Sequence, residues 1–333
     1  MQLNVGLLGG GSWGTTVASL VARNTGVKLW ARDAETVEQI NREHRNEKYL
    51  PGAKLPDSLT ATTDIADAVG IADVLIMGIP SQGFRSVLEQ VKPHLRAWVP
   101  VISLTKGLEL DTRKRMTEII KEVLPGHPVG VLTGPNLARE IMAGQAAASV
   151  IAMEDEIIVQ ELQELFRSGL FRVYTNDDVI GCELGGVLKN IIAIAVGMGD
   201  GQGAGDNTRS ALITRGLAEV TRLGVAMGGR AETFAGLAGM GDMIATCTSP
   251  QSRNRHVGVQ LGKGRHIDDI IEEMVMVAEG VKSAPAVMAL AEENNISMPI
   301  ASDVFRVVSG EATARQAFRG LLRVTPGAES EPG

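Results

Sequence analysis

The stretch LNVGLLGGGSWGTT at residues 3–16 decides the fold. A short apolar run precedes Gly9, Gly11 and Gly14, which have G-x-G-x-x-G spacing, and the proline-free segment 15–22 suits a helix. Strand, glycine turn and helix are the setting in which this spacing binds a dinucleotide. The first glycine permits the turn, the second lets the backbone approach a pyrophosphate, and the third lets the helix pack against the strand. The helix N-terminus then offers N–H groups to the phosphates.

A second strand is predicted at residues 27–31, VKLWA, and it leads into Arg32 and Asp33. These two residues lie roughly 20 positions beyond the glycine loop, where a residue that reads the ribose is expected. Arg32 could meet a 2′-phosphate, whereas Asp33 could accept a hydrogen bond from a free 2′-hydroxyl. Two plainer interpretations stay open: a βαβ turn without a ligand, and Arg32 as a solvated charge at the end of a strand.

The composition limits the class of protein. A chain of 333 residues predicts two domains of about 100–200 residues each. The net charge of −7 argues against a general nucleic-acid surface, but a local basic cleft could still attract an anionic small molecule. Cys182 and Cys247 have no metal-ligand spacing, so we expect reduced thiols in a cytosolic protein and no metal site.

Targeting and membrane signals are not expected. The N-terminus has no basic region ahead of an apolar one. The longest apolar run, residues 191–196, is far shorter than the roughly 18 residues that a spanning helix needs. We therefore expect a cytoplasmic protein without integral membrane contact.

Strands and helices alternate through the first half of the chain. Nearly all-apolar runs predict strands buried on both faces, and they lie at residues 73–79, 99–104 and 129–132, with further strands at 147–152 and 171–175. Helices are expected between them, at residues 82–91, from Asp111 or Thr112 to 123, and at 154–166. After residue 176 only helix-length segments remain, broken by glycine-rich loops predicted at 197–205 and 236–241.

This order predicts an α/β fold with a Rossmann-type doubly wound sheet, followed by an all-α domain. We expect the dinucleotide-binding domain over residues 1–180 and a helical substrate-binding domain over 181–325. Residues 326–333, rich in Pro, Gly, Ser and Glu, predict a disordered tail.

Two lysines stand out. Lys106 directly follows a predicted strand, so it could point into the crevice at the carboxyl edge of the sheet, or be a surface charge. Lys189 lies in LGGVLKNIIAIAVGM, residues 184–198, with almost no other polar side chain. Burial would lower its pKa and make it a general acid/base near neutral pH, unless it reaches solvent from the helix edge. Asn190 beside it could hold a substrate oxygen.

A polar cluster, QSRNRH at residues 251–256, precedes another expected helix. The donors of Ser252, Arg253 and Asn254 suit a phosphate, although a capped, basic surface helix would have the same pattern. Asp242 could cap a helix from residue 243 or face substrate hydroxyls.

Several stretches together resemble one family. They are GGGSWGTTVA at 9–18, LTKGLE at 104–109, TGPNLAREI at 133–141, LGGVLKNIIAIAVGM at 184–198, NTRSALITRGLAE at 207–219, GMGD at 239–242, TCTSPQSRNRHVG at 246–258 and VAEGVKS at 277–283. The chain resembles the bacterial-type NAD(P)-dependent glycerol-3-phosphate dehydrogenases. The resemblance implies reduction of dihydroxyacetone phosphate to sn-glycerol 3-phosphate by NADPH or NADH, which supplies phospholipid synthesis. We also expect a homodimer.

The motifs and the resemblance assign residues to three roles. Lys189 is the expected acid/base, and Lys106 adds positive charge beside the reacting oxygen. The expected cofactor-binding residues are Gly9, Gly11, Ser12, Trp13, Gly14, Arg32, Lys106, Ala138, Arg253, Val277 and Glu279. The expected substrate-binding residues are Lys106, Gly134, Asn136, Lys189, Asn190, Asp242, Thr246, Ser252, Arg253 and Asn254. Many family members carry Ser or Thr where this chain has Asn136, so an altered substrate geometry is expected.

Two other functions stay open. The chain could be another β-hydroxyacid dehydrogenase, acting on a hydroxy acid or 6-phosphogluconate, because those enzymes also combine a Rossmann domain with a helical domain that carries a helix lysine and an asparagine. The SRNR and TKG stretches argue against it. It could also be a non-catalytic sensor of nicotinamide nucleotides, which the intact Lys106, Lys189 and Arg253 disfavour.

Overall fold

The computed structural model describes residues 3–274 and 278–321. The chain forms two compact units: Met1–Thr105 with Lys114–Val179, and Lys106–Arg113 with Ile180–Gly333. The segment Lys106–Arg113 was expected in the first domain. It joins the second unit because Leu108, which is fully buried, packs in the core of that unit. The predicted tail at residues 326–333 lies outside the described residues.

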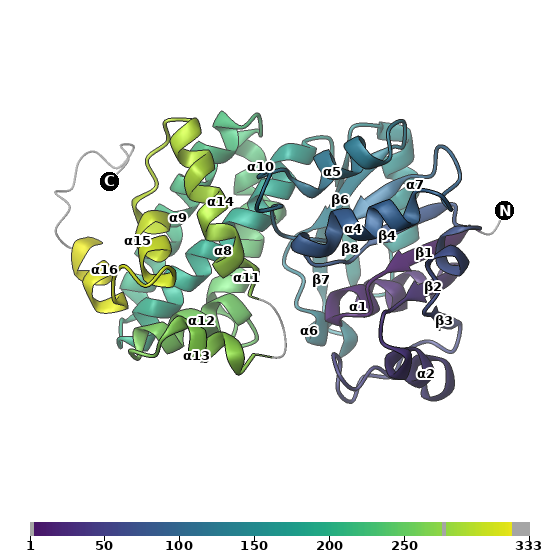
Figure 1. Cartoon of the computed structure of the whole chain (residues 1–333), viewed down its shortest axis with the longest axis horizontal. Helices are drawn as coiled ribbons and strands as arrows, with labels where there is room; N and C mark the ends of the chain where they lie inside the picture. Colours follow the sequence, from purple (N-terminus) through teal and green to yellow (C-terminus); the bar gives the residue numbers. More distant parts are fainter. Residues whose placement is uncertain (1–2, 275–277, 322–333) are drawn as a thin grey trace. The chain divides into compact units, whose positions relative to one another are not determined.

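An eight-stranded sheet forms the centre of the first unit, in the order β3-β2-β1-β4-β5-β6-β7-β8 (Figure 1). The strands are β1 (Asn4–Leu8), β2 (Gly26–Trp30), β3 (Leu59–Thr62), β4 (Val74–Met77), β5 (Val101–Ser103), β6 (Val129–Thr133), β7 (Ala147–Met153) and β8 (Phe171–Asn176). All neighbours pair in parallel except β6 and β7, which are antiparallel. The strand order reverses at β1 and β4, and the crevice at such a switch point is where ligands bind.

Helices cover both faces of this sheet. They are α1 (Ser12–Val21), α2 (Ala34–Glu43), α3 (Ile65–Val69), α4 (Ser81–Val91), α5 (Met116–Val123), α6 (Ala138–Met142) and α7 (Glu156–Phe166). One apolar core contains buried residues of α1, α6 and α7, and a separate core contains those of α3, α4 and α5. Two cores on one sheet are the mark of a doubly wound fold, so the predicted Rossmann-type architecture is confirmed.

The second unit is helical in its described part. Its elements are α8 (Val179–Gly201), α9 (Asp206–Ala226), α10 (Ala231–Ala235), the π-helical turn η1 (Leu237–Gly241), α11 (Asp242–Thr248), α12 (Arg253–Gly262), α13 (Ile267–Glu272), α14 (Glu279–Glu293), α15 (Pro299–Val308) and α16 (Ala314–Leu321) (Figure 1). By length and composition α8 could cross a membrane, but 94% of its most apolar window is buried inside the protein. It is therefore the central core helix of this unit.

Close packing between α8 and α12 explains why the loop predicted at residues 197–205 is shorter than expected, since only residues 202–205 connect α8 and α9. The helix α8 continues to Gly201. A Cβ on Gly197 would lie 2.2 Å from the backbone oxygen of Arg255, and one on Gly201 would lie 2.3 Å from that of Val259. Gly258 of α12 is as close to the backbone of α8, since its Cβ would lie 2.1 Å from the oxygen of Ile194. These glycines bring two helix backbones together rather than making a turn.

The second glycine-rich stretch, residues 236–241, is also not an open loop. It winds into η1, between α10 and α11. A Cβ on Gly239 would lie 2.1 Å from the oxygen of Phe234, and one on Gly185 of α8 would lie 2.7 Å from the oxygen of Ala238. The absence of side chains therefore lets the π-helical turn lie directly against α8, and α11 begins at its end.

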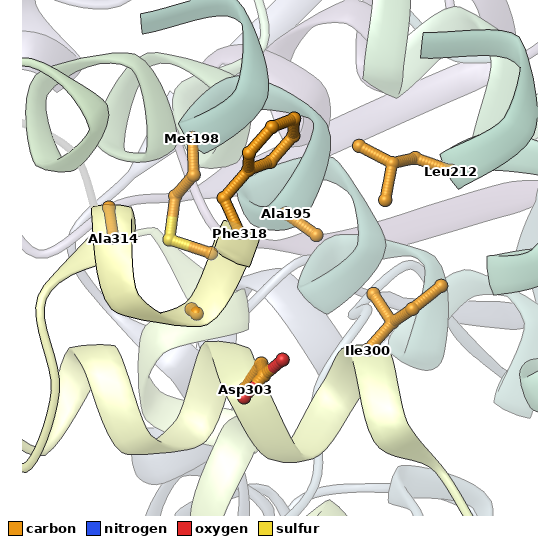
Figure 2. Close-up of a pocket in the computed structure, with 8 residues that line it drawn as sticks. Ala195, Met198, Leu212, Ile300, Asp303, Ala314 and Phe318 are labelled. Carbon is orange, nitrogen blue, oxygen red and sulfur yellow. The ribbon is translucent and has the colours of Figure 1, made fainter. Parts of the chain in front are cut away.

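A small pocket lies among α8, α9, α15 and α16 (Figure 2). It is lined by Ala195, Met198, Leu212, Ile300, Asp303, Ala314, Ala317 and Phe318. Its free volume of about 10 Å³ holds about one water molecule. None of its lining residues is a predicted site residue, and it is too small for a nucleotide.

The backbone contact of α8 and α12 predicts opposite effects of two alanine substitutions on one helix. Gly197→Ala should lower the free energy of unfolding of the second unit by about 1–3 kcal/mol, because the new methyl group meets backbone that cannot move aside cheaply. Gly199→Ala is the control, and its free energy of unfolding should rise. Its Cβ would lie 3.5 Å from a leucine methyl, which is an ordinary contact, and alanine favours a helix. Denaturant unfolding followed by circular dichroism measures both. Equal stability of the two variants would contradict the contact.

Candidate active site

The glycine loop in the first unit has a distinct geometry at each of its three glycines. Gly9 has φ +121°, a conformation that favours glycine, and its Cβ would lie 2.3 Å from the oxygen of Gly78. A Cβ on Gly14 would lie 2.0 Å from the oxygen of Gly9. At Gly11 no atom lies within 4 Å of such a Cβ. Two glycines are therefore required by close packing, and the third leaves open space at the start of α1.

Donors at the start of α1 suit an anionic ligand. Gly11 is the N-cap and provides no side-chain hydrogen bond, so the first N–H groups of the helix are not taken by a cap. The indole Nε1 of Trp13 is buried and has no hydrogen-bond partner among the described residues. A helix N-terminus with open space beside it is a site for phosphate groups. The residues of this loop therefore fit the pyrophosphate of a dinucleotide.

The two residues beyond β2 differ in their surroundings. Arg32 is exposed. Asp33 is the N-cap of α2, and its side chain accepts hydrogen bonds from Glu35 N at 3.2 Å and from Thr36 Oγ1 at 2.9 Å. The carboxylate thus stabilises the start of a helix, in addition to the role in ribose recognition that its position predicts.

Residues at the carboxyl end of β6 also offer an unused donor. Gly134 has φ +126° and redirects the chain there. The Oδ1 atom of Asn136 accepts a hydrogen bond from Ser149 Oγ. Its Nδ2 atom is buried without a partner among the described residues. Ala138 begins α6 two residues later. The amide of Asn136 is therefore held by one end and free to donate with the other.

In the second unit, one carboxylate connects two lysines. Lys189 Nζ lies 2.5 Å from Asp242 Oδ1, and Lys106 Nζ lies 2.6 Å from Asp242 Oδ2. Lys189 Nζ also lies 2.5 Å from the hydroxyl of Thr246, which itself donates to the backbone oxygen of Asp242 at 2.7 Å. The exposed fractions of the side chains are 5% for Lys189, 2% for Asp242 and 19% for Lys106. Asp242 and Thr246, four residues apart, present both groups on one face of α11.

This arrangement resolves two alternatives. Lys189 does not reach solvent from the helix edge, because it is buried. Asp242 does not cap α11, because its side chain binds the lysines. Burial lowers the pKa of Lys189 to about 8, with the charge of Lys106 acting in the same direction and Asp242 opposing both. Lys189 can therefore release and regain a proton near neutral pH.

A chain of amides positions the backbone around this cluster. Asn254 Nδ2 donates to Asn190 Oδ1 at 2.9 Å, and Asn254 Oδ1 accepts from the N–H of Gly280 at 3.0 Å. Asn190 Nδ2 lies 3.4 Å from the backbone oxygen of Lys106. Both asparagines are buried. They join α8, α12 and the start of α14 to the segment that carries Lys106.

The polar cluster before α12 is partly structural. Ser252 caps this helix, and its Oγ accepts from Arg255 N at 3.2 Å. Arg253 is exposed at the first position of the helix. Arg255 forms an ion pair with Asp200 at 2.6 Å, and Asp200 also pairs with Arg209. The sequence pattern did not indicate this pairing. An acidic residue, Asp200, within the glycine-rich stretch was the one sign in the sequence that a basic partner lies nearby.

Two predicted cofactor residues remain. Glu279 is the first residue of α14, and Val277 lies outside the described residues. The structure thus brings Lys106, Lys189, Asn190, Asp242, Thr246 and Asn254 together in the second unit. The glycine loop, Arg32, Gly134, Asn136 and Ala138 lie in the first unit.

Comparison with known proteins identifies the family of this chain. A family model described as the N-terminus of NAD-dependent glycerol-3-phosphate dehydrogenase matches residues 4–159, and a model of its C-terminus matches residues 178–319. The chain belongs to the NAD-dependent glycerol-3-phosphate dehydrogenase family. The predicted family is therefore confirmed, and with it the class of NAD(P)-dependent oxidoreductases.

Individual members of the glycerol-3-phosphate dehydrogenase family match over almost their whole length. A protein of Sphingopyxis alaskensis named as an NAD(P)+ glycerol-3-phosphate dehydrogenase is 73% identical over 100% of both chains. One of Mycobacterium tuberculosis is 56% identical over 97% of this chain and 95% of its own. The crystal structure of the glycerol-3-phosphate dehydrogenase of Coxiella burnetii, 37% identical, covers 97% of this chain and 99% of its own with a TM-score of 0.93.

The bridge between the lysines predicts how the pKa of Lys189 responds to substitution. Asp242→Asn removes the negative charge that opposes desolvation, so the pKa of Lys189 should fall below about 8. A pH titration of protein labelled with ¹³C at lysine Cε, followed by NMR, measures it, with the Lys189→Gln spectrum giving the assignment. Asp268→Asn, an exposed acid of α13, is the control and should leave the titration unchanged. An unchanged or raised pKa in Asp242→Asn would contradict the arrangement.

Proposed function

We propose that this chain catalyses the reversible, NAD(P)H-dependent reduction of dihydroxyacetone phosphate to sn-glycerol 3-phosphate. The observation that carries the proposal is the buried amine of Lys189, with a pKa of about 8, joined through Asp242 to a second ammonium group. Reduction of a ketone requires a proton at the oxygen that becomes a hydroxyl, and Lys189 can supply it near neutral pH. Membership of the glycerol-3-phosphate dehydrogenase family supports this substrate.

The reaction divides between the cofactor and the protein. A bound reduced nicotinamide supplies the hydride that forms the new C–H bond at C2. Lys189 Nζ donates a proton to the C2 oxygen, so the carbonyl becomes a secondary alcohol. Lys106 places a positive charge beside the oxygen while negative charge develops on it, and a preorganised charge of this kind lowers the barrier. Asp242 keeps both ammonium groups in place before the substrate arrives.

Most of the other predicted residues bind the cofactor or the substrate in this proposal, and two asparagines position the backbone. The glycine loop, Ser12, Trp13 and Arg32 hold the dinucleotide, together with Ala138, Val277 and Glu279. The guanidinium group of Arg253 and the N-terminus of α12 bind the substrate phosphate, and the free amide donor of Asn136 binds a substrate oxygen. Binding energy from the phosphate, which does not react, holds the ketone in a productive position. Asn190 and Asn254 position Lys106 and α14.

The cellular setting follows from the same proposal. The enzyme acts in the cytoplasm as a homodimer, without integral membrane contact and without nucleic acid. Its product is the backbone to which acyl chains are added in phospholipid synthesis. These statements rest on the composition and on the family, together with the burial of α8 in a protein core.

A steady-state assay tests the reaction directly. Oxidation of NADPH and of NADH, followed at 340 nm, should depend on dihydroxyacetone phosphate. A 2-keto acid should give no turnover, and neither should 6-phosphogluconate when NADP⁺ reduction is followed. Turnover of either compound in preference to dihydroxyacetone phosphate would favour another β-hydroxyacid dehydrogenase. Nucleotide binding without any turnover would favour a sensor.

Substitution of Lys189 separates chemistry from binding. Lys189→Ala should lower kcat by about 10²–10⁴, the usual contribution of a general acid, while the Kd of NADPH, measured by fluorescence titration, stays within about twofold. Lys263→Ala, an exposed lysine after α12, is the matched control and should keep full activity. A kcat close to that of the unsubstituted enzyme in Lys189→Ala would remove this residue from the mechanism.

The pKa of Lys189 also sets a pH dependence with a defined sign. Reduction needs the protonated amine, so kcat/KM for dihydroxyacetone phosphate should fall as the pH rises through about 8. Oxidation of glycerol 3-phosphate needs the neutral amine, so its kcat/KM should rise over the same range. Initial rates in both directions between pH 6 and 10 measure this, and profiles with the same sign in both directions would argue against a single acid/base.

A further inference from the structure

The segment at residues 46–50 is fastened to the glycine loop of the first unit. Asn46 is fully buried, and its Nδ2 donates to the backbone oxygen of Gly10 and to Thr15 Oγ1, each at 2.9 Å. Ser12 Oγ donates to the backbone oxygen of Tyr49 at 2.9 Å. These bonds connect the segment to the loop and to the first turn of α1. Any side chain presented by the segment is therefore held at a defined place beside the loop.

Lys48 is the side chain that this segment presents. Its Nζ lies 3.0 Å from Asp33 Oδ2 and 5.7 Å from the centre of the Tyr49 ring. The side chain of Lys48 is 52% exposed, so a ligand can reach the ammonium group. Asp33 stands at the end of β2, where residues of dinucleotide-binding sheets contact the adenosine ribose. The fold thus places a lysine next to the residue that distinguishes a ribose hydroxyl from a phosphate.

The charge of Asp33 is compensated in this arrangement. An acid at this position normally accepts from the 2′-hydroxyl of NADH and repels the 2′-phosphate of NADPH. Here the carboxylate already accepts from Lys48, Thr36 and the N–H of Glu35. The hydrogen bond from Lys48 is the main cause that lowers the pKa of Asp33, and the same bond raises the pKa of Lys48. Both groups are therefore charged at neutral pH, and their charges cancel.

Arg32 adds a second cation at the end of β2. It is exposed and adjacent to Asp33 in the chain. Arg32 and Lys48 are thus two cations near the one carboxylate of Asp33, while Glu35 is a further acid whose charge acts on Lys48. A dianionic phosphate can accept hydrogen bonds from both cations, whereas a ribose hydroxyl gains little from the second cation.

We propose that Lys48 is a specificity-determining residue which, with Arg32, binds the 2′-phosphate of NADPH, so that the enzyme prefers NADPH to NADH. Asp33 acts as the anchor of Lys48 in this arrangement. The proposal rests on the proposed function, because it concerns the cofactor site of the same enzyme. It assigns a role to a residue outside the glycine loop that none of the sequence motifs indicated.

Direct binding measurements test the proposal independently of catalysis. The Kd values of NADPH and NADH are measured by fluorescence titration for the whole chain and for Lys48→Gln. The unsubstituted protein should bind NADPH more tightly. In Lys48→Gln the Kd of NADPH should rise about tenfold, the effect of losing one charge-assisted hydrogen bond, while that of NADH should change less than about twofold. Lys48→Arg, which keeps the charge, should retain most of the preference.

A second lysine, four residues beyond the segment at residues 46–50, provides the control. Lys54 is 76% exposed and lies near Asp57 rather than Asp33, so Lys54→Gln should leave both Kd values unchanged. The probe 2′,5′-ADP should lose affinity for Lys48→Gln, and 5′-AMP should not. Equal weakening of both dinucleotides in Lys48→Gln, no weakening, or tighter binding of NADH by the unsubstituted protein would each overturn the proposal. If the unsubstituted protein bound neither dinucleotide, the proposed function itself would fail.

Discussion

The interaction on which the second unit depends is the contact of a single carboxylate, Asp242, with two ammonium groups. Two lysines and one acid leave a net positive charge in a largely buried place, which is costly unless every charge has a partner. Asp242 and Thr246 supply those partners for Lys189. A site with one excess positive charge and a loosely held proton suits an oxygen on which negative charge develops. Burial is the main reason why the pKa of Lys189 is low although an acid touches it, and the positive charge of Lys106 lowers it further.

The packing of the helices in the second unit fixes the positions of the residues that make this contact. Lys189 lies on α8, whose neighbouring residues are part of a mostly aliphatic core. The π-helical turn η1 lies against Gly185 of α8 and delivers Asp242 at the first position of α11. Gly197 and Gly258 bring the backbones of α8 and α12 together, so the residues at the start of α12 keep a fixed position along α8. Backbone contact leaves little freedom, and the positions of the charged groups are correspondingly well defined.

Much of the first unit could be predicted, because its signals are local. Buried parallel strands are continuous apolar runs, and a glycine turn between a strand and a helix is recognised from its G-x-G-x-x-G spacing. The strand β3 escaped prediction because it has only four residues at the edge of the sheet, with exposed and buried positions mixed. Residues 197–201 and 237–241 of the second unit were misinterpreted as loops, because glycine serves both in a turn and in a close helix contact. A turn and a close helix contact can be distinguished only when the backbone that packs against the glycine is known. Lys48 and Asp200 were missed for a similar reason: their partners are distant in the sequence.

The path of the chain has a consequence for how this protein could be divided. Lys106–Arg113 belongs to the helical unit, although residues on both sides of it belong to the sheet. A fragment that begins at residue 180 would therefore lack Leu108 from its core, and Asp242 would face one ammonium group instead of two. The helical half is not an independent module that could be moved by cutting the gene at one point. An exchange or duplication of the helical half would have to include the eight residues Lys106–Arg113 as well. The two halves of the chain are therefore expected to have been inherited together.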